Sequence, residues 1–344
     1  MRIEGFSSLR FQPLAHTERA NKSMKFNINV LQINPAQETK KIADFVTNQV
    51  DRVFRRRGVV VGLSGGIDSA VMTAIAVRSI GKENVVGLIL PDKESNPVSR
   101  QYANTYAETL GIECREIDIT PTVDSVGDYH WRDEYIKNLI PDYSSDCKYN
   151  ISLPTDLLDR DAYNFYVLQV KLPDGTIKKK RLNFEAFRTI TAFASIKIRS
   201  RMIHLYWEAE RHNLVVAGTT NRTEFILGDF CKYGDGGTDI EALSHLYKDQ
   251  IYQIAGYLGV PAEIINRTPS PDTFSLPVSD QEFYFRIPFD KLDRLLFAWE
   301  HRISSIKTSE VLGLSEDAVN RVFRDFSTKN RATDHLREMA HTLS

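Results

Sequence analysis

The feature that most constrains the fold is a short, wholly apolar run at 59–63 that leads directly into a glycine-containing loop and a helix. The run reads Val-Val-Val-Gly-Leu, and β-branched residues without polar alternation are typical of a strand buried on both faces. The loop Ser64-Gly65-Gly66 follows, and 67–80 has the composition of a helix that stops at Gly81. Such a strand belongs in a parallel sheet with helices on both faces.

The same alternation continues along most of the chain. Further strands are predicted at 84–90, 114–119 and 214–217, and further helices at 38–54, 98–110, 184–212, 223–227 and 247–258. Strands that alternate with helices over short connections predict an α/β fold with a doubly wound parallel sheet and right-handed crossovers. The C-terminal tail, 289–344, is predicted to be mainly helical.

The alternation breaks in an inserted segment at about 121–183. An alternating run at 166–172 meets the turn Asp174-Gly175, which predicts a β-hairpin. The return arm carries Lys-Lys-Lys-Arg at 178–181, the strongest basic cluster in the chain. We interpret this arm as a solvated sheet edge protected by its lysines, and contact with phosphate or nucleic acid is the alternative.

Composition excludes several classes of protein. The 344 residues carry 44 basic and 45 acidic side chains, a net charge of −1, so no overall positive field favours nucleic acid or anionic lipid. Neither a membrane helix nor a secretory signal is present, and we expect a cytoplasmic protein without a membrane partner. Cys114, Cys147 and Cys231 are far apart, which argues against disulfides and a cysteine zinc site.

The pattern divides the chain into two parts. Residues 1–37 are expected to be an N-terminal leader, partly disordered, within which Met24 is a more natural start. Residues 38–344 are expected to form one catalytic domain, interrupted by the insertion at about 121–183. A length of 344 residues is compatible with two domains or with one elaborated domain, and the continuous α/β pattern favours the second.

The loop between the first strand and its helix has the chemistry of a phosphate cradle. Glycines let the backbone approach an anion, the hydroxyls of Ser64 and Ser69 are donors, and the first amides of the helix point at the bound group. Neither a Walker A loop nor a dinucleotide fingerprint is present. Asp68 would repel a phosphate unless a divalent cation lay between them, and Mg²⁺ is the natural bridge.

The sequence Ser-Gly-Gly-Ile-Asp-Ser at 64–69 resembles the pyrophosphate loop of the ATP pyrophosphatase superfamily, whose members cleave ATP between its α and β phosphates. Downstream blocks resemble the ammonia-dependent NAD synthetases in particular. These blocks lie in family order and, with the loop, cover roughly Gly58 to Asp293 apart from the insertion. They occupy 196–202, 215–224, 232–239, 246–248 and 269–272.

The resemblance implies a role for each matching residue. It makes Asp68, Glu224 and Lys248 the catalytic group, with Asp68 and Glu224 as the Mg²⁺ ligands. It assigns Arg199, Lys232 and Asp239 to the substrate deamido-NAD. It assigns ATP to Gly62, Leu63, Ser64, Gly65, Gly66, Ile67, Asp68, Ser69, Thr219, Lys248 and Ser270.

The implied reaction is a two-step amidation. ATP would convert the nicotinate carboxylate of deamido-NAD into an acyl adenylate with release of pyrophosphate, and ammonia would then displace AMP to give NAD. Fewer than about 60 residues precede the first strand, too few for a glutaminase domain, so ammonia is the expected nitrogen donor. By analogy with the family we expect a homodimer and no nucleic-acid partner.

Four places depart from the family pattern, and all lie on the side of the acid substrate. Ser195 stands where the family has asparagine, 281–288 replaces an acidic residue followed by Leu-Gly, 329–331 is the best match for a C-terminal basic segment, and the insertion is extra. An amide ligase that acts on another carboxylic acid is therefore the main alternative. The others are a tRNA-thiolating enzyme, which would need a reactive thiol, and a catalytically silent nucleotide sensor.

Overall fold

A four-stranded parallel sheet lies at the centre of the computed structural model, which describes residues 26–160 and 165–343. Its strands are β1 (Gly58–Gly62), β2 (Val85–Ile89), β3 (Glu113–Glu116) and β7 (Leu214–Ala217), in the order β3-β2-β1-β7. The central strand β1 pairs Val59 with Val85 on one side and with Val215 on the other. This double pairing confirms the predicted parallel sheet. The run is apolar because both faces of the strand are buried: Val59 and Val61 belong to one core and Val60 to the other.

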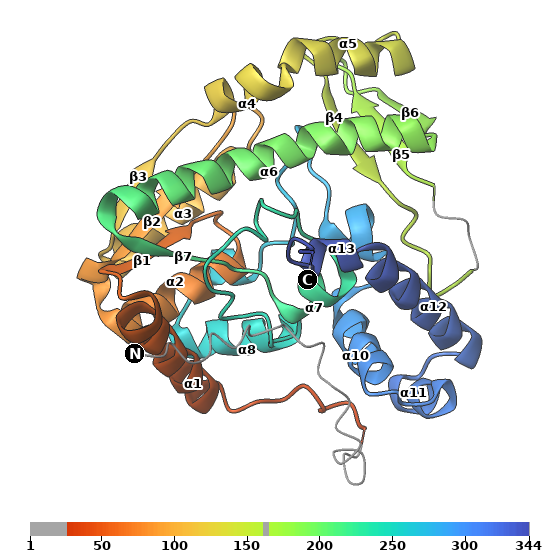
Figure 1. Cartoon of the computed structure of the whole chain (residues 1–344). Coiled ribbons are helices and arrows are strands. Elements are labelled where there is room, and N and C mark those ends of the chain that lie inside the picture. Colours follow the sequence, from red (N-terminus) through yellow and green to blue (C-terminus); the bar gives the residue numbers. More distant parts are fainter. Residues whose placement is uncertain (1–25, 161–164, 344) are drawn as a thin grey trace.

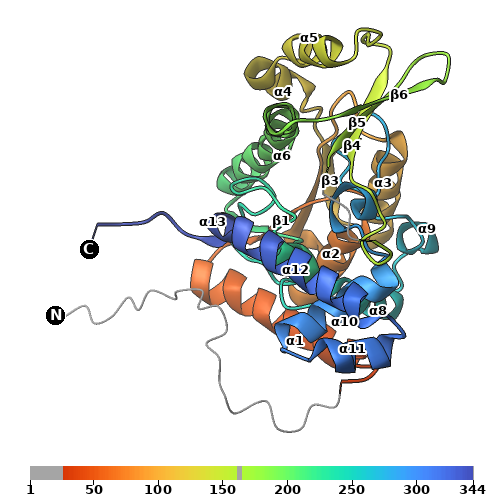
Figure 2. The same cartoon turned by 90° about the vertical axis from the view of Figure 1, so that its right-hand side faces the viewer.

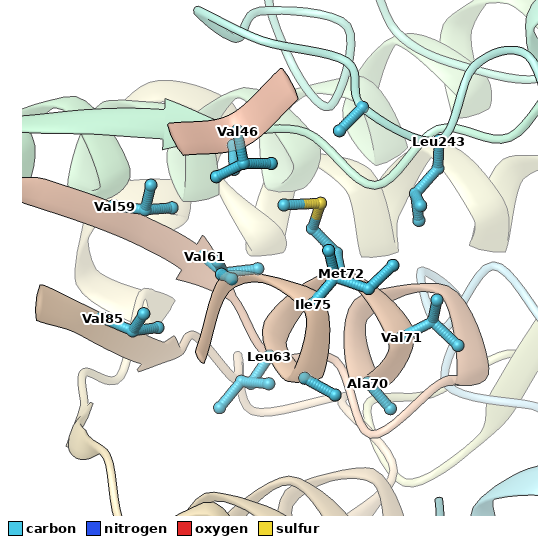
Figure 3. Packing of buried hydrophobic residues seen from close by; sticks show 14 of the residues in the cluster. Val46, Val59, Val61, Leu63, Ala70, Val71, Met72, Ile75, Val85 and Leu243 are labelled. Carbon is cyan, nitrogen blue, oxygen red and sulfur yellow. The ribbon is translucent and has the colours of Figure 1, made fainter. Parts of the chain in front are cut away.

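Helices cover both faces of this sheet (Figure 1). One face packs against α1 (Pro35–Asn48), α2 (Ile67–Ile80), α3 (Pro97–Leu110) and α8 (Lys248–Leu258). Figure 3 shows part of this core, where Val59 and Val61 of β1 lie beside Met72 and Ile75 of α2. The other face packs against α4 (Thr120–Gly127) and α6 (Phe184–His212). The doubly wound prediction is therefore confirmed.

The insertion contains more structure than the sequence predicted. The hairpin is present as β5 (Val167–Lys171) and β6 (Ile177–Arg181), but a third strand, β4 (Lys148–Ser152), and the helix α5 (Tyr129–Leu139) were not predicted. The buried positions of α5 are a tyrosine, an arginine and one isoleucine, so it shows no regular apolar period. Strand β6 lies at one edge of this sheet and all five of its residues are exposed, as predicted for the basic arm.

The long helix α6 belongs to two hydrophobic cores. Near its start, Ala186 and Ile190 pack in the core of the insertion. Further along, Phe193 and Ala209 pack against the central sheet. In Figure 1 the helix runs from the insertion across the sheet, and Figure 2 views it nearly along its axis.

The C-terminal region is helical, as predicted. It comprises α10 (Phe289–Glu300), α11 (Ser305–Leu312), α12 (Glu316–Ala332) and α13 (Asp334–Arg337). The first three of these helices share a core with Phe26 and Leu31, which are buried. Most of the expected leader, 1–37, lies outside the described residues, including Met24. Its described part thus contacts the C-terminal helices.

Shorter elements complete the fold. The predicted helix at 38–54 is regular only to the end of α1 and continues as a π-helical turn, η1 (Gln49–Phe54). The remaining elements are η2 (Lys82–Asn84), α7 (Arg222–Leu227), α9 (Ala262–Ile265) and η3 (Gln281–Phe285). Among the described residues the three cysteines form no disulfide, and no described helix has the length and apolar character of a membrane crossing.

Candidate active site

The loop between β1 and α2 is held in an anion-binding shape by its own serines. Gly65 has a φ of 71°, which favours glycine. The Gly66 amide donates to Ser64 Oγ at 3.2 Å, and the Ser69 hydroxyl donates to the Gly66 carbonyl at 2.9 Å. Gly66 is the N-cap of α2, so the first free amides of the helix open toward the loop.

Replacing Gly65 with alanine is expected to weaken ATP binding by about tenfold or more. A Cβ there would lie 2.2 Å from the Ser99 carbonyl oxygen, and the positive φ adds strain. The matched control is Gly66→Ala, whose Cβ would lie 3.2 Å from Ser64 Oγ with φ at −97°. Calorimetric titration with ATP would compare the two, and equal affinities would contradict this account of the loop.

A cavity of about 200 Å³ adjoins the loop at the carboxyl ends of β1, β2 and β7. Four of the predicted ATP residues, Gly62, Leu63, Ser64 and Thr219, line it. Much of the remaining wall is aliphatic, from Leu88, Leu90, Ile198, Met202 and Leu205. An apolar slot with a few polar groups at its rim suits a planar heterocycle such as a nucleotide base.

The three predicted catalytic residues meet beside the loop. Lys248 opens α8 and its side chain is 6% exposed. Its Nζ lies 2.5 Å from Asp68 Oδ2, in the first turn of α2, and 3.4 Å from Glu224 Oε1, in α7. Asn221 Nδ2 donates to the other oxygen of Asp68 at 3.0 Å. Residues up to 180 positions apart in sequence thus form one charged cluster.

Negative charge is in excess around this lysine. Burial and the neighbouring Asp68 raise the pKa of Glu224 although Lys248 opposes the change. Burial and the charge of Asp68 also raise the pKa of Asp280, to about 6. For Lys248 itself, the attraction of Asp68 and Glu224 outweighs burial and raises the pKa. A further cation would therefore be stabilised at this place.

The donor set fits Mg²⁺ bound together with a phosphate. In the described ranges no three carboxylate, histidine or cysteine side chains form a preformed metal centre. Mg²⁺ commonly takes one or two protein carboxylates and completes its shell with phosphate oxygens and water. Asp68 and Glu224, which share Lys248 as a partner, are such a pair of carboxylates beside an anion loop.

The other predicted residues lie in three different settings. Arg199 and Lys232 are neighbours, because Arg199 Nε donates to the Lys232 carbonyl at 3.3 Å. Asp239 accepts from the Val216 amide at 2.8 Å and from a tyrosine hydroxyl, so both of its oxygens have internal partners. Ser270 lines a second cavity of about 500 Å³, which shares Asn96 with the first.

Sequence reasoning missed several residues that complete the site. Arg267 donates to the Gly65 carbonyl at 3.2 Å and to Ser99 Oγ at 2.7 Å, and so joins the loop to α3. Asn221 caps α7 and forms a capping box with Glu224. The spacing of Asn221 and Glu224 is a capping signature that could have placed a helix start there. Nothing local in the sequence marks Arg267.

A buried carboxyl group also supports the turn that follows β7. Glu241 accepts from Thr238 Oγ1 at 3.0 Å. Its carboxyl group lies so close to Gly218 that a Cβ there would be 2.3 Å from Oε1. Burial raises the pKa of Glu241 to about 8, although the bond from Thr238 opposes the shift. Gly218 lines the smaller cavity, so this carboxyl group supports the cavity wall.

The Glu241→Gln variant is expected to gain stability relative to the parent as the pH rises from about 4.5 to about 8. In that window the unfolded parent has lost the Glu241 proton and the folded parent has kept it, so its free energy of unfolding falls with pH. The difference should grow by up to about 1.4 kcal/mol per pH unit and level off above that window. Urea unfolding of both proteins across pH measures it.

The control for this prediction is Glu310→Gln, because the Glu310 side chain is 60% exposed. Its difference from the parent should be nearly independent of pH. A Glu241→Gln difference that is equally flat would show that Glu241 is ionised in the folded protein.

Comparison with known sequences identifies relatives along nearly the whole chain. The family model described as NAD synthase matches residues 38–158 and 167–340. The NH₃-dependent NAD⁺ synthetase of Rhizobium meliloti (strain 1021) is 40% identical over 311 residues, which cover 90% of this chain and 92% of the relative. The enzyme of the same name from Thermotoga maritima is 35% identical over 261 residues, covering 76% and 86%.

Comparison with solved structures shows the same fold. The NMN synthetase of Francisella tularensis superposes with a TM-score of 0.61 at 22% identity and covers 91% of this chain and 99% of that one. The NH₃-dependent NAD synthetase of Campylobacter jejuni superposes with a TM-score of 0.58 at 22% identity, covering 91% and 100%. With the family model matching most of its length, the chain belongs to the NAD synthase family.

Proposed function

We propose that this protein is an ammonia-dependent NAD synthetase, which converts deamido-NAD, ammonia and ATP into NAD, AMP and pyrophosphate. The observation that carries the proposal is the meeting of Asp68, Glu224 and Lys248 beside the glycine loop, in a chain of this family. The curated relatives bear the name of that activity.

The cluster supplies what adenylation needs. A carboxylate is a poor electrophile, so it must first attack the α phosphate of ATP and expel pyrophosphate. The amides of the loop would hold the phosphates, and Lys248 would offset negative charge that develops on them. We assign the base to the apolar cavity and the phosphate contacts to Ser64, Ser69 and Ser270. When bound by Asp68 and Glu224, Mg²⁺ would supply further neutralisation of the phosphates.

Ammonia would then attack the carbonyl of the acyl adenylate and release AMP. Only neutral ammonia is a nucleophile, and water that reached the adenylate would hydrolyse it. No covalent enzyme intermediate is needed. Lys248 is buried, and the side chains of Asp68 and Glu224 are only 16% and 21% exposed, which limits the access of bulk water to this region.

The thiol chemistry of the tRNA-thiolation alternative has little support among the described cysteines. Burial raises the pKa of Cys114 to about 11, and burial also raises the pKa of Cys231. Thiols with raised pKa values are poor nucleophiles at neutral pH. The exposed basic strand β6 lies in the insertion, on a different sheet from the loop.

The identity of the acid is the part of the proposal that a substrate screen tests most directly. The departures from the family pattern are expected on the side of the acid substrate. One of them is the best match for the family's C-terminal basic segment, where Lys329 points inward. Lys329 donates to the Tyr284 carbonyl at 2.8 Å and to Asp325. We assign Arg199, Lys232 and Asp239 to deamido-NAD. The expected homodimer stays a prediction.

The experiment measures AMP release from ATP and Mg²⁺ with a panel of carboxylic acids, using ammonium or glutamine as nitrogen source. Deamido-NAD with ammonium should give NAD and AMP in equal amounts. AMP formation with nicotinate mononucleotide or another acid, and none with deamido-NAD, would replace the proposed substrate. No AMP with any acid would favour the nucleotide sensor.

A further inference from the structure

An ionic network holds the loop that lies between the two cavities, and three of its members, Glu94, Arg132 and Asp133, line the larger cavity. At its centre, the fully buried side chain of Lys197, from α6, lies between two carboxylates. Its Nζ is 2.7 Å from Asp92 Oδ2 and 2.5 Å from Glu94 Oε2. Both acids follow β2, at the start of the loop 92–96. Lys197 therefore ties this loop to α6.

The insertion supplies the other half of the network. Arg132 of α5, with a side chain only 3% exposed, donates to Glu94 through both terminal nitrogens, at 2.9 and 2.8 Å. The same guanidinium donates to the Tyr149 hydroxyl at 3.0 Å, and the Tyr129 hydroxyl donates to Asp92 at 2.6 Å. A bidentate arginine–carboxylate pair fixes the orientation of the carboxylate as well as its distance. Arg132 therefore orients Glu94 and the loop that carries it.

The charges of the network balance. Three carboxylates, Asp92, Glu94 and Asp133, face three cations, Lys197, Arg132 and Arg201. Arg132 pairs with Asp133 as well as with Glu94, and the charge of Arg201 acts on Asp92. Burial would raise the pKa of Asp92 and of Glu94, but Lys197 and its neighbours outweigh it and hold each below its ordinary value. These two acids are therefore ionised at neutral pH, and loss of one cation would leave an uncompensated buried charge.

The loop that this network holds is a wall of both cavities. Ser95 and Asn96 line the smaller cavity and the larger one. Ser95 Oγ donates to Asp92 Oδ1 at 2.8 Å. This bond fixes Ser95 relative to Asp92, which Lys197 holds in place. At the end of the loop, the backbone N–H of Asn96 donates to Asp272, which also lines both cavities. A shift of Glu94 would therefore move the wall of the nucleotide cavity.

We propose that Arg132 is a positioning residue for the nucleotide: through Glu94 it makes the insertion hold the loop 92–96 in place as the wall of the ATP cavity. The inference rests on the proposed function, because it takes ATP as the occupant of that cavity. It gives the insertion a role in ATP binding, although none of its residues belongs to the glycine loop or to the charged cluster.

The test compares Arg132→Met with the unaltered protein by calorimetric titration of a non-hydrolysable ATP analogue and by steady-state kinetics. We expect the analogue to bind about tenfold more weakly and the KM for ATP to rise to the same extent, with kcat changed less than about threefold. Arg132→Lys should recover part of the affinity. The matched control is Arg160→Met, which removes an insertion arginine whose side chain is 73% exposed.

A double variant separates positioning from a merely structural role. Arg132→Met with Glu94→Gln removes one charge of each sign and leaves Lys197 paired with Asp92. Asp133, whose side chain is 21% exposed, keeps the hydrogen bond from the Tyr143 hydroxyl, so the melting temperature should recover toward that of the parent. The ATP affinity should stay low because nothing orients the loop. Affinity that recovers with the melting temperature, or affinity unchanged in Arg132→Met, would overturn the inference. Failure of the unaltered protein to bind the analogue would overturn the proposed function as well.

Discussion

Replacing Asp68 with asparagine is expected to lower kcat for NAD formation about a thousandfold while the protein stays folded. Asparagine keeps the shape of the side chain and can still accept the hydrogen bond from Asn221. It removes the charge that pairs with Lys248 at 2.5 Å and that would hold Mg²⁺ against the phosphates. Initial rates of AMP release at saturating Mg²⁺ and ATP measure the effect.

The matched control is Asp44→Asn, because Asp44 forms only a surface pair with Lys40 and its side chain is 66% exposed. That variant should retain the parent rate. Glu224→Gln should behave like Asp68→Asn. A rate above about a tenth of the parent in Asp68→Asn would contradict a Mg²⁺-binding role for this carboxylate.

Replacing Lys248 with methionine is expected to abolish turnover and to cost about 3 kcal/mol of folding free energy at neutral pH. The methionine fills the space of the stem but leaves Asp68 and Glu224 facing each other without their shared cation. Added Mg²⁺ should restore part of the lost stability, since it replaces the missing positive charge. Urea unfolding with and without Mg²⁺ measures this effect.

Acid should restore stability in the same variant. Burial and Asp68 already raise the pKa of Glu224 against the effect of Lys248, so without that cation Glu224 binds a proton more readily, and its protonation removes the repulsion from Asp68. The stability deficit of Lys248→Met should therefore shrink as the pH falls from about 8 to about 5. Adding Glu224→Gln should also reduce the deficit without returning activity. A deficit independent of pH and of Glu224 would show that Lys248 acts through packing alone.

The parts of the molecule that could be predicted from the sequence are those encoded locally. The apolar run at 59–63 predicted a strand buried on both faces, and β1 is an inner strand of the sheet whose residues Gly58–Val61 are buried. The glycine loop predicted an anion cradle because Gly65 and the serine hydroxyls act within six residues of chain. The resemblance placed Glu224 and Lys248, which the fold brings to Asp68.

The parts that could not be predicted depend on contacts between distant segments. Lys197 lies 103 residues from Glu94, and no local pattern marks it as buried. A lysine or arginine inside a protein requires a carboxylate partner, and the sequence does not say which one lies near. For the same reason α5 was missed, since its inward face is formed by Tyr129, Arg132 and Ile136 rather than by an aliphatic stripe.

Because α6 belongs to both the insertion core and the sheet core, the insertion is not a detachable module. Deleting 121–183 would remove most of the partners of Ala186 and Ile190 and expose these residues to water. A graft of the insertion onto a shorter synthetase would likewise have to carry the first half of α6.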